Sequence, residues 1–192
     1  MTLNISPFPP LRWEDYFWVS EVTLPSWSGF QTRRGWYGSV SDDSPSNGTA
    51  RLNVVPEDEE RRSHPTVEQE VAFKYMLDHE AAVTASVLQA LFNRYPDEKA
   101  AYAGDYSEDG AEETLPDITD PSGLRALIGL SNVHVLSVVK DGAAYIGFEF
   151  GCAWDEEHGA GVMTHQGRVI AVGQADTAFL EWIAGRDVKS NK

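Results

Sequence analysis

Four consecutive residues, Asp155-Glu156-Glu157-His158, have the side chains in this sequence that are best suited to chemistry. Three carboxylates and an imidazole stand between Trp154 and Gly159, and glycine's freedom at positive φ permits a sharp turn that gathers them. Carboxylates and imidazoles exchange protons in acid–base catalysis, and the same oxygen and nitrogen atoms are metal ligands. This segment is therefore the first candidate site.

The alternative interpretation of this segment is structural, and the sequence favours it. Carboxylates in tight loops commonly accept hydrogen bonds from backbone amides, and a histidine there can donate to one of them. Adjacent side chains also point in different directions, so the four residues cannot all ligate one ion without distortion. We therefore assign no catalytic residue, no metal ligand and no cofactor. The candidate binding residues of the segment are Asp155, Glu156, Glu157 and His158.

A second candidate surface is the acidic stretch from Gly104 to Asp120, which contains no lysine or arginine. Its glycines and its lack of apolar periodicity predict a long loop, and long loops in compact domains are often functional. Its candidate binding residues are Asp105, Glu108, Asp109, Glu112 and Glu113.

The net charge of −15 restricts the partners that the chain can have. A protein this acidic is repelled by nucleic-acid phosphates and anionic membranes, and it attracts basic molecules. We therefore expect a basic protein partner, no nucleic acid and no membrane, although acidity also serves solubility alone. The oligomeric state stays open.

Cysteine usage and the N-terminus predict a cytoplasmic protein. Cys152 is the one cysteine, which excludes an intramolecular disulfide and a four-thiolate zinc site. Its neighbours Phe150 and Trp154 predict a buried, structural thiol. Residues 1–10 lack the basic start and apolar run of a signal peptide, and no stretch approaches the ~18 apolar residues of a membrane helix.

The elements that must position these residues predict a single α+β domain over 1–192. We expect a β-rich N-terminal part at 1–56, a helical part at 66–103, and a C-terminal antiparallel β-meander at 120–184 with a short closing helix. Sheet order is not predictable from these patterns.

In the N-terminal part, residues 36–40 and 51–55 are expected to be facing strands joined by a polar loop at 42–48. The second strand alternates, with Leu52 and Val54 on one face and Arg51 and Asn53 on the other.

In the helical part, Thr66 and Gln69 have the spacing of a capping box. The apolar stripe that follows is weakest at 78–80, which leaves one long helix or two. Pro96 predicts the start of a new short helix that ends at Gly104.

In the C-terminal part, Asp141-Gly142 and Gln166-Gly167 are expected at the turns of two hairpins. The strand before Trp154 alternates sharply, and a closing helix is expected at 176–183. On one face of that strand lie Ile146, Phe148, Phe150 and Cys152, and on the other Tyr145, Gly147, Glu149 and Gly151.

The run from Gly147 through Val162 contains the pattern F-x-C-x-W-D-x-E-H-G-x-G-V and resembles an uncharacterised bacterial family of the domain-of-unknown-function kind. The resemblance extends to the helix from Thr66 and the spacer Leu115-Pro116, about two thirds of the chain. Residues 1–55 are less recognisable, and Ala160 stands where the family pattern has a larger apolar residue. Members are similar to proteins found beside polymorphic toxins and proposed as immunity proteins. The family has no established catalytic residues, so the resemblance implies a fold neighbourhood and leaves the activity open.

Three functions remain open. The first is a protein-binding module, immunity-like, that docks a basic partner through the acidic residues named above. The second is a metal-dependent or acid–base enzyme that uses Asp155 to His158. The third is an oligomeric scaffold that uses exposed aromatic residues.

Overall fold

The α+β fold is confirmed by a computed structural model that describes residues 2–105 and 115–190. Within these residues one mixed sheet has eight strands in chain order, from β1 to β8. All neighbours pair antiparallel except β4 and β5, which are parallel. The strands are β1 Thr2–Leu3, β2 Leu11–Glu14, β3 Phe17–Arg34, β4 Val40–Val54, β5 Ile128–Lys140, β6 Ala143–Cys152, β7 Ala160–His165 and β8 Arg168–Gly173.

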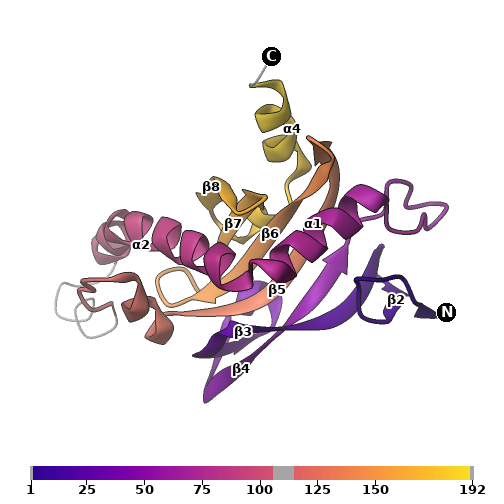
Figure 1. Cartoon of the computed structure of the whole chain (residues 1–192). Helices are drawn as coiled ribbons and strands as arrows, with labels where there is room; N and C mark the ends of the chain where they lie inside the picture. The colour runs from indigo at the N-terminus through magenta and orange to yellow at the C-terminus, as the bar shows by residue number, and fades with distance from the viewer. Residues whose placement is uncertain (1, 106–114, 191–192) are drawn as a thin grey trace.

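Two helices, α1 Val67–Asp78 and α2 Glu80–Asp105, connect β4 to β5 and lie across one face of the sheet (Figure 1). The expected capping box is present, since Thr66 and Gln69 each bond the other's backbone amide. Gln69 is also fully buried, and its amide donates to Val55 O at 2.7 Å and Leu136 O at 3.0 Å. It therefore ties α1 to the joint between β4 and β5.

The main core lies between α1, α2 and the sheet, where the alternating apolar residues of the strands meet Phe73, Met76 and Val87. A smaller core lies on the opposite face, under the C-terminal helix α4 Glu181–Lys189. There Tyr145 and Leu136 pack against Ile183. A strand such as β6, with all ten residues buried, is therefore covered on both sides.

The expected arrangement of residues 36–55 is wrong in detail. Residues 36–38 form a 3-10 turn, η1 Trp36–Gly38, and the predicted loop at 42–48 is part of β4. Irregular pairing with β3 absorbs the turn residues, because register shifts interrupt the ladder. Asp42 and Asn47 accept hydrogen bonds from amides two residues on, at 3.0 and 2.9 Å, so turn-like bonds are accommodated within the strand.

Two helix boundaries also differ from expectation. Pro96 lies inside α2, and the buried Tyr95 beside it holds the helix in place by donating to Pro116 O at 2.8 Å. The closing helix is two pieces, η3 Ala175–Ala178 and α4, separated by Phe179 and Leu180.

Other local predictions are confirmed. The turn residues Asp141-Gly142 and Gln166-Gly167 all have positive φ, as two-residue hairpin loops require. The 3-10 helix η2 Pro121–Ala126 precedes β5, and the Asp120 side chain caps it by accepting from the Ser122 amide. Among the described helices, none has the length and apolarity needed to cross a membrane.

Candidate functional site

A row of polar side chains crosses the centre of the sheet on the face opposite α1 and α2. The ladder pairs Arg51 and Asn53 of β4 with Asn132 and His134 of β5, and Asn132 with Glu149 of β6. Because side chains alternate along a strand, these five share one face, while neighbours such as Leu52 enter the main core on the other. Three strands from distant parts of the sequence thus form a polar floor.

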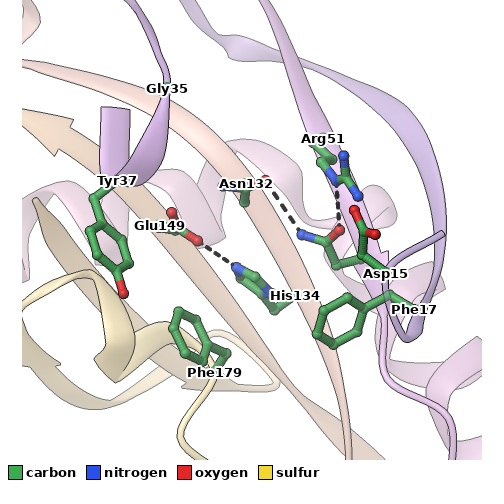
Figure 2. A pocket seen from close by; sticks show the side chains of 10 residues that line it. Asp15, Phe17, Gly35, Tyr37, Arg51, Asn132, His134, Glu149 and Phe179 are labelled. Atoms are coloured by element: carbon green, nitrogen blue, oxygen red, sulfur yellow. Dashed lines mark hydrogen bonds and ion pairs between the residues drawn. The ribbon is translucent and has the colours of Figure 1, made fainter. Parts of the chain in front are cut away.

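This floor is the base of a pocket of about 470 Å³ (Figure 2). The turn between β2 and β3 supplies Asp15, the start of β3 supplies Phe17, and the segment around η1 supplies Gly35 and Tyr37. Phe179, between η3 and α4, completes the wall. A cavity of this size with aromatic walls and a few polar groups is the usual form of a ligand site.

The centre of the pocket is a buried His134–Glu149 pair. Nε2 of His134 lies 2.8 Å from Oε2 of Glu149, and the two side chains are only 7% and 6% exposed. The Phe179 ring packs against the imidazole with ring centroids 5.2 Å apart. The other ring nitrogen, Nδ1, is buried and has no hydrogen-bond partner. An unpaired buried polar atom costs about 1–3 kcal/mol, so this site keeps its imidazole at the expense of stability.

A hydrogen-bonded chain continues from the floor to the edge of the sheet. Asn53 Nδ2 donates to Asn132 Oδ1 at 3.4 Å, and Arg51 Nε donates to Asn53 Oδ1 at 2.9 Å. Arg51 also pairs with Glu14 at 2.9 Å. Hydrogen bonds from Arg12 and then Arg51 hold the pKa of Glu14 below its ordinary value. Arg51 therefore shares the Glu14 carboxylate with Arg12.

Gly147 positions the Phe179 wall. It stands opposite His134 on β6, and a Cβ there would lie 1.7 Å from the carbonyl oxygen of Ala178. The missing side chain lets η3 lie directly on the sheet, which places Phe179 next to His134.

The predicted segment Asp155 to His158 lies outside this pocket, in the loop between β6 and β7. Asp155 Oδ1 accepts from the His158 amide at 2.9 Å and lies 3.0 Å from His158 Nδ1. Its Oδ2 accepts from Gln174 at 3.3 Å. Both oxygens of Asp155 are thus engaged in holding the loop together.

The other residues of the segment are exposed. Glu156 lies 3.6 Å from the guanidinium of Arg33, whose side chain is almost fully buried, while Glu157 and the His158 side chain face solvent. Across the described residues, no group of three or more histidine, cysteine, aspartate or glutamate side chains is placed to hold a metal ion. Binding by Glu156, Glu157 and His158 stays a prediction.

The acidic stretch is described only at its ends. Asp105 is the last residue of α2, and Glu108, Asp109, Glu112 and Glu113 lie outside the described residues. At the far end Asp117 pairs with Lys99 at 2.7 Å. Hydrogen bonds from the Ser122 hydroxyl and then its amide hold the pKa of Asp120 below its ordinary value.

The buried cysteine is confirmed. Burial raises the pKa of Cys152 to about 12, so its thiol stays protonated at neutral pH.

Sequence reasoning placed Arg51, Asn53 and Glu149 on the polar sides of their strands but did not connect them. The available signal was that alternate positions in three otherwise apolar strands carry amide, imidazole and carboxylate groups. These positions can be recognised as one site only when β4 is known to pair with β5, and that pairing is visible only in the folded sheet.

Comparison with the curated proteins and with the solved structures found no match. Residues 27–180, most of the chain, match the family described as "Domain of unknown function (DUF6985)". The match starts well before Thr66 and so includes the later part of β3 and all of β4, which the resemblance covered poorly. It also contains Asn53, Asn132, His134 and Glu149. The chain belongs to this family of domains of unknown function, DUF6985.

Proposed function

We propose that this protein is a binding protein whose pocket over β4–β6 receives a group from a basic protein partner. The observation that carries the proposal is the buried His134–Glu149 pair at the base of a cavity of about 470 Å³. Residues that are buried, polar and aimed at a cavity contribute little to stability, and they are typical of recognition sites.

The charge of the whole chain supports a basic partner. At −15, its field speeds the approach of a cationic protein and slows the approach of an anionic one. An immunity-like role fits this proposal, since an immunity protein acts by occupying a toxin and needs no chemistry of its own.

Calorimetry with the protein encoded beside this chain tests the proposal. Glu149→Gln and Phe179→Ala change the floor and the wall of the pocket, and we expect each to weaken binding by about tenfold or more. Glu59→Gln is the matched control, because it removes the same charge from an exposed position far along the chain. Equal affinity for all four proteins would refute a role for the pocket.

In the same proposal, the acidic stretch attracts the basic partner and so raises the association rate. Neutralising Asp105, Glu108, Asp109, Glu112 and Glu113 together should slow association and reduce its dependence on salt, with little change in dissociation. If the association rate is indifferent to this change, the electrostatic part of the proposal fails.

The alternative function is a metal-dependent or acid–base enzyme that works through Asp155 to His158. The exposed His158 ring beside the Asp155 carboxylate favours it. Elemental analysis of the purified protein and of His158→Ala is the test. A stoichiometric metal that the variant loses would favour the enzyme, and an equal metal content in both would exclude this site.

A further inference from the structure

We infer that the group received by the pocket is a guanidinium, as in an arginine side chain, with Glu149 as its counter-ion. This inference rests on the proposed function and specifies the chemistry of the guest. The charge of the pocket, the chemistry of its walls and the way in which Arg51 is bound on the same face lead to it separately.

The charges around the pocket favour a cation. The lining contains two carboxylates, Glu149 in the floor and Asp15 at the rim, against one guanidinium, Arg51, which already pairs with Glu14 at 2.9 Å. An anionic guest would face uncompensated carboxylates in a protein that already carries −15. A cationic guest gains from both.

The walls favour a flat cation. Phe17, Tyr37 and Phe179 line the pocket, and in Figure 2 the two phenylalanine rings lie on either side of His134. Aromatic faces attract cations, and a guanidinium adds planar stacking that an ammonium lacks.

The floor already binds one guanidinium of the protein itself. Arg51 donates Nε to the amide oxygen of Asn53 and another nitrogen to the carboxylate of Glu14. One carboxylate and one amide oxygen therefore suit a guanidinium on this face. Asn132 and Glu149, opposite each other in the ladder, offer the same pair of groups deeper in the pocket.

The imidazole of His134 holds the Glu149 carboxylate in the pocket floor. Nε2 of His134 lies 2.8 Å from Oε2 of Glu149, and both side chains are almost fully buried. The proposed counter-ion is therefore fixed in position before a guest arrives, which favours binding. The other charged residues that line the pocket are Asp15 and Arg51.

Three small probes test the chemistry by NMR on the intact protein. N-acetylarginine amide is the guest, N-acetylcitrulline amide is its neutral isostere, and N-acetyllysine amide carries the charge without the plane. We expect the arginine probe to shift the side-chain amide signals of Asn53 and Asn132, with an affinity about tenfold above that for lysine and no saturable binding of citrulline. Equal binding of the citrulline probe would overturn the inference. Equal binding of the lysine probe would show that the pocket recognises a positive charge and not a guanidinium.

Two variants complete the test. Glu149→Gln keeps the shape and a hydrogen bond to His134 but removes the negative charge, and we expect it to lose binding of the arginine probe. Glu59→Gln should bind as the unmodified chain does. Phe179→Ala, checked for folding by circular dichroism, should also lose binding of the arginine probe, because it removes an aromatic wall without changing the charge. If Glu149→Gln binds the arginine probe unchanged, the inferred counter-ion is wrong. If the probes fail while pocket variants still weaken the protein partner, the guest chemistry fails and the proposed function stands.

Discussion

At the scale of single residues, Asp187 joins α4 to three strands. Its carboxylate accepts from Lys140 Nζ at 2.9 Å, from the Tyr145 hydroxyl at 2.8 Å and from Arg168 at 2.8 Å. Burial alone would raise the pKa of Asp187, but the hydrogen bonds from Arg168, Lys140 and Tyr145 outweigh it and hold the pKa well below its ordinary value. One charged side chain thus secures the layer that carries the pocket wall.

Asp187→Asn should therefore destabilise the fold by about 3 kcal/mol near neutral pH, since it leaves the buried Lys140 without its counter-ion. Because the folded-state pKa lies below the unfolded value, this contribution is complete above about pH 5 and is lost as pH falls toward the folded pKa. The gap in unfolding free energy between the two proteins should shrink in acid. Urea denaturation from neutral to acidic pH measures it, with the exposed turn variant Asp141→Asn as control. A gap that is constant with pH would contradict the ion-pair account.

At the scale of elements, η3 and β6 fit together because Gly147 has no side chain. Gly161 of β7 supports the same contact, since a Cβ there would lie 2.5 Å from the Gln174 carbonyl oxygen. Two glycines on neighbouring strands therefore allow η3 to pack directly against the backbone of the sheet. The position of Phe179 follows from backbone packing more than from its own ring contacts.

Gly147→Ala tests this fit. The added methyl meets backbone atoms that cannot rotate away, so we expect a loss of about 3 kcal/mol together with loss of guest binding. Gly185→Ala is the matched control, because nothing lies within 4 Å of a Cβ at that helical position. It should be neutral or stabilising by up to about 1 kcal/mol. Thermal unfolding of both variants gives the comparison, and equal stability would mean that η3 shifts without cost.

At the scale of the whole molecule, the sheet separates two cores of unequal size. The large one includes α1, α2 and most strands, while the small one lies under α4. Elements with few buried apolar partners open first. The candidate pocket is bounded by the smaller layer through Phe179, so we expect its wall to belong to the less stable side.

Native-state hydrogen exchange should resolve this difference. We expect the amides of α4 to exchange through an opening about 2 kcal/mol less costly than the one that exposes β5 and β6. Asp187→Asn should further lower the free energy of the opening that exposes the α4 amides. Coincident free energies for α4 and β6 would show that the molecule opens as one unit.

Local features were predictable from the sequence and long-range ones were not. The Thr66–Gln69 box and the Asp141-Gly142 turn depend on residues within three positions of each other, and both are present. The segment Asp155 to His158 attracted attention for the same reason: its residues are contiguous. Asn53 and Asn132 bond across 79 positions, and no local pattern brings them together. The candidate pocket was invisible because pairing distant strands is a property of the folded sheet.

The parallel pairing of β4 with β5 sets when the candidate pocket can form. Residues 51–54 pair with residues 132–135, and the segment between them contains α1 and α2. Closing a loop of this length is slow. Neither half of the chain alone contains the floor, since Asn53 comes from one half and Asn132, His134 and Glu149 from the other. A growing chain on the ribosome therefore cannot form the pocket floor until β6 has emerged, and the wall at Phe179 follows later still. A bound guest would report that both halves have joined, and it would favour that union over any partly assembled form.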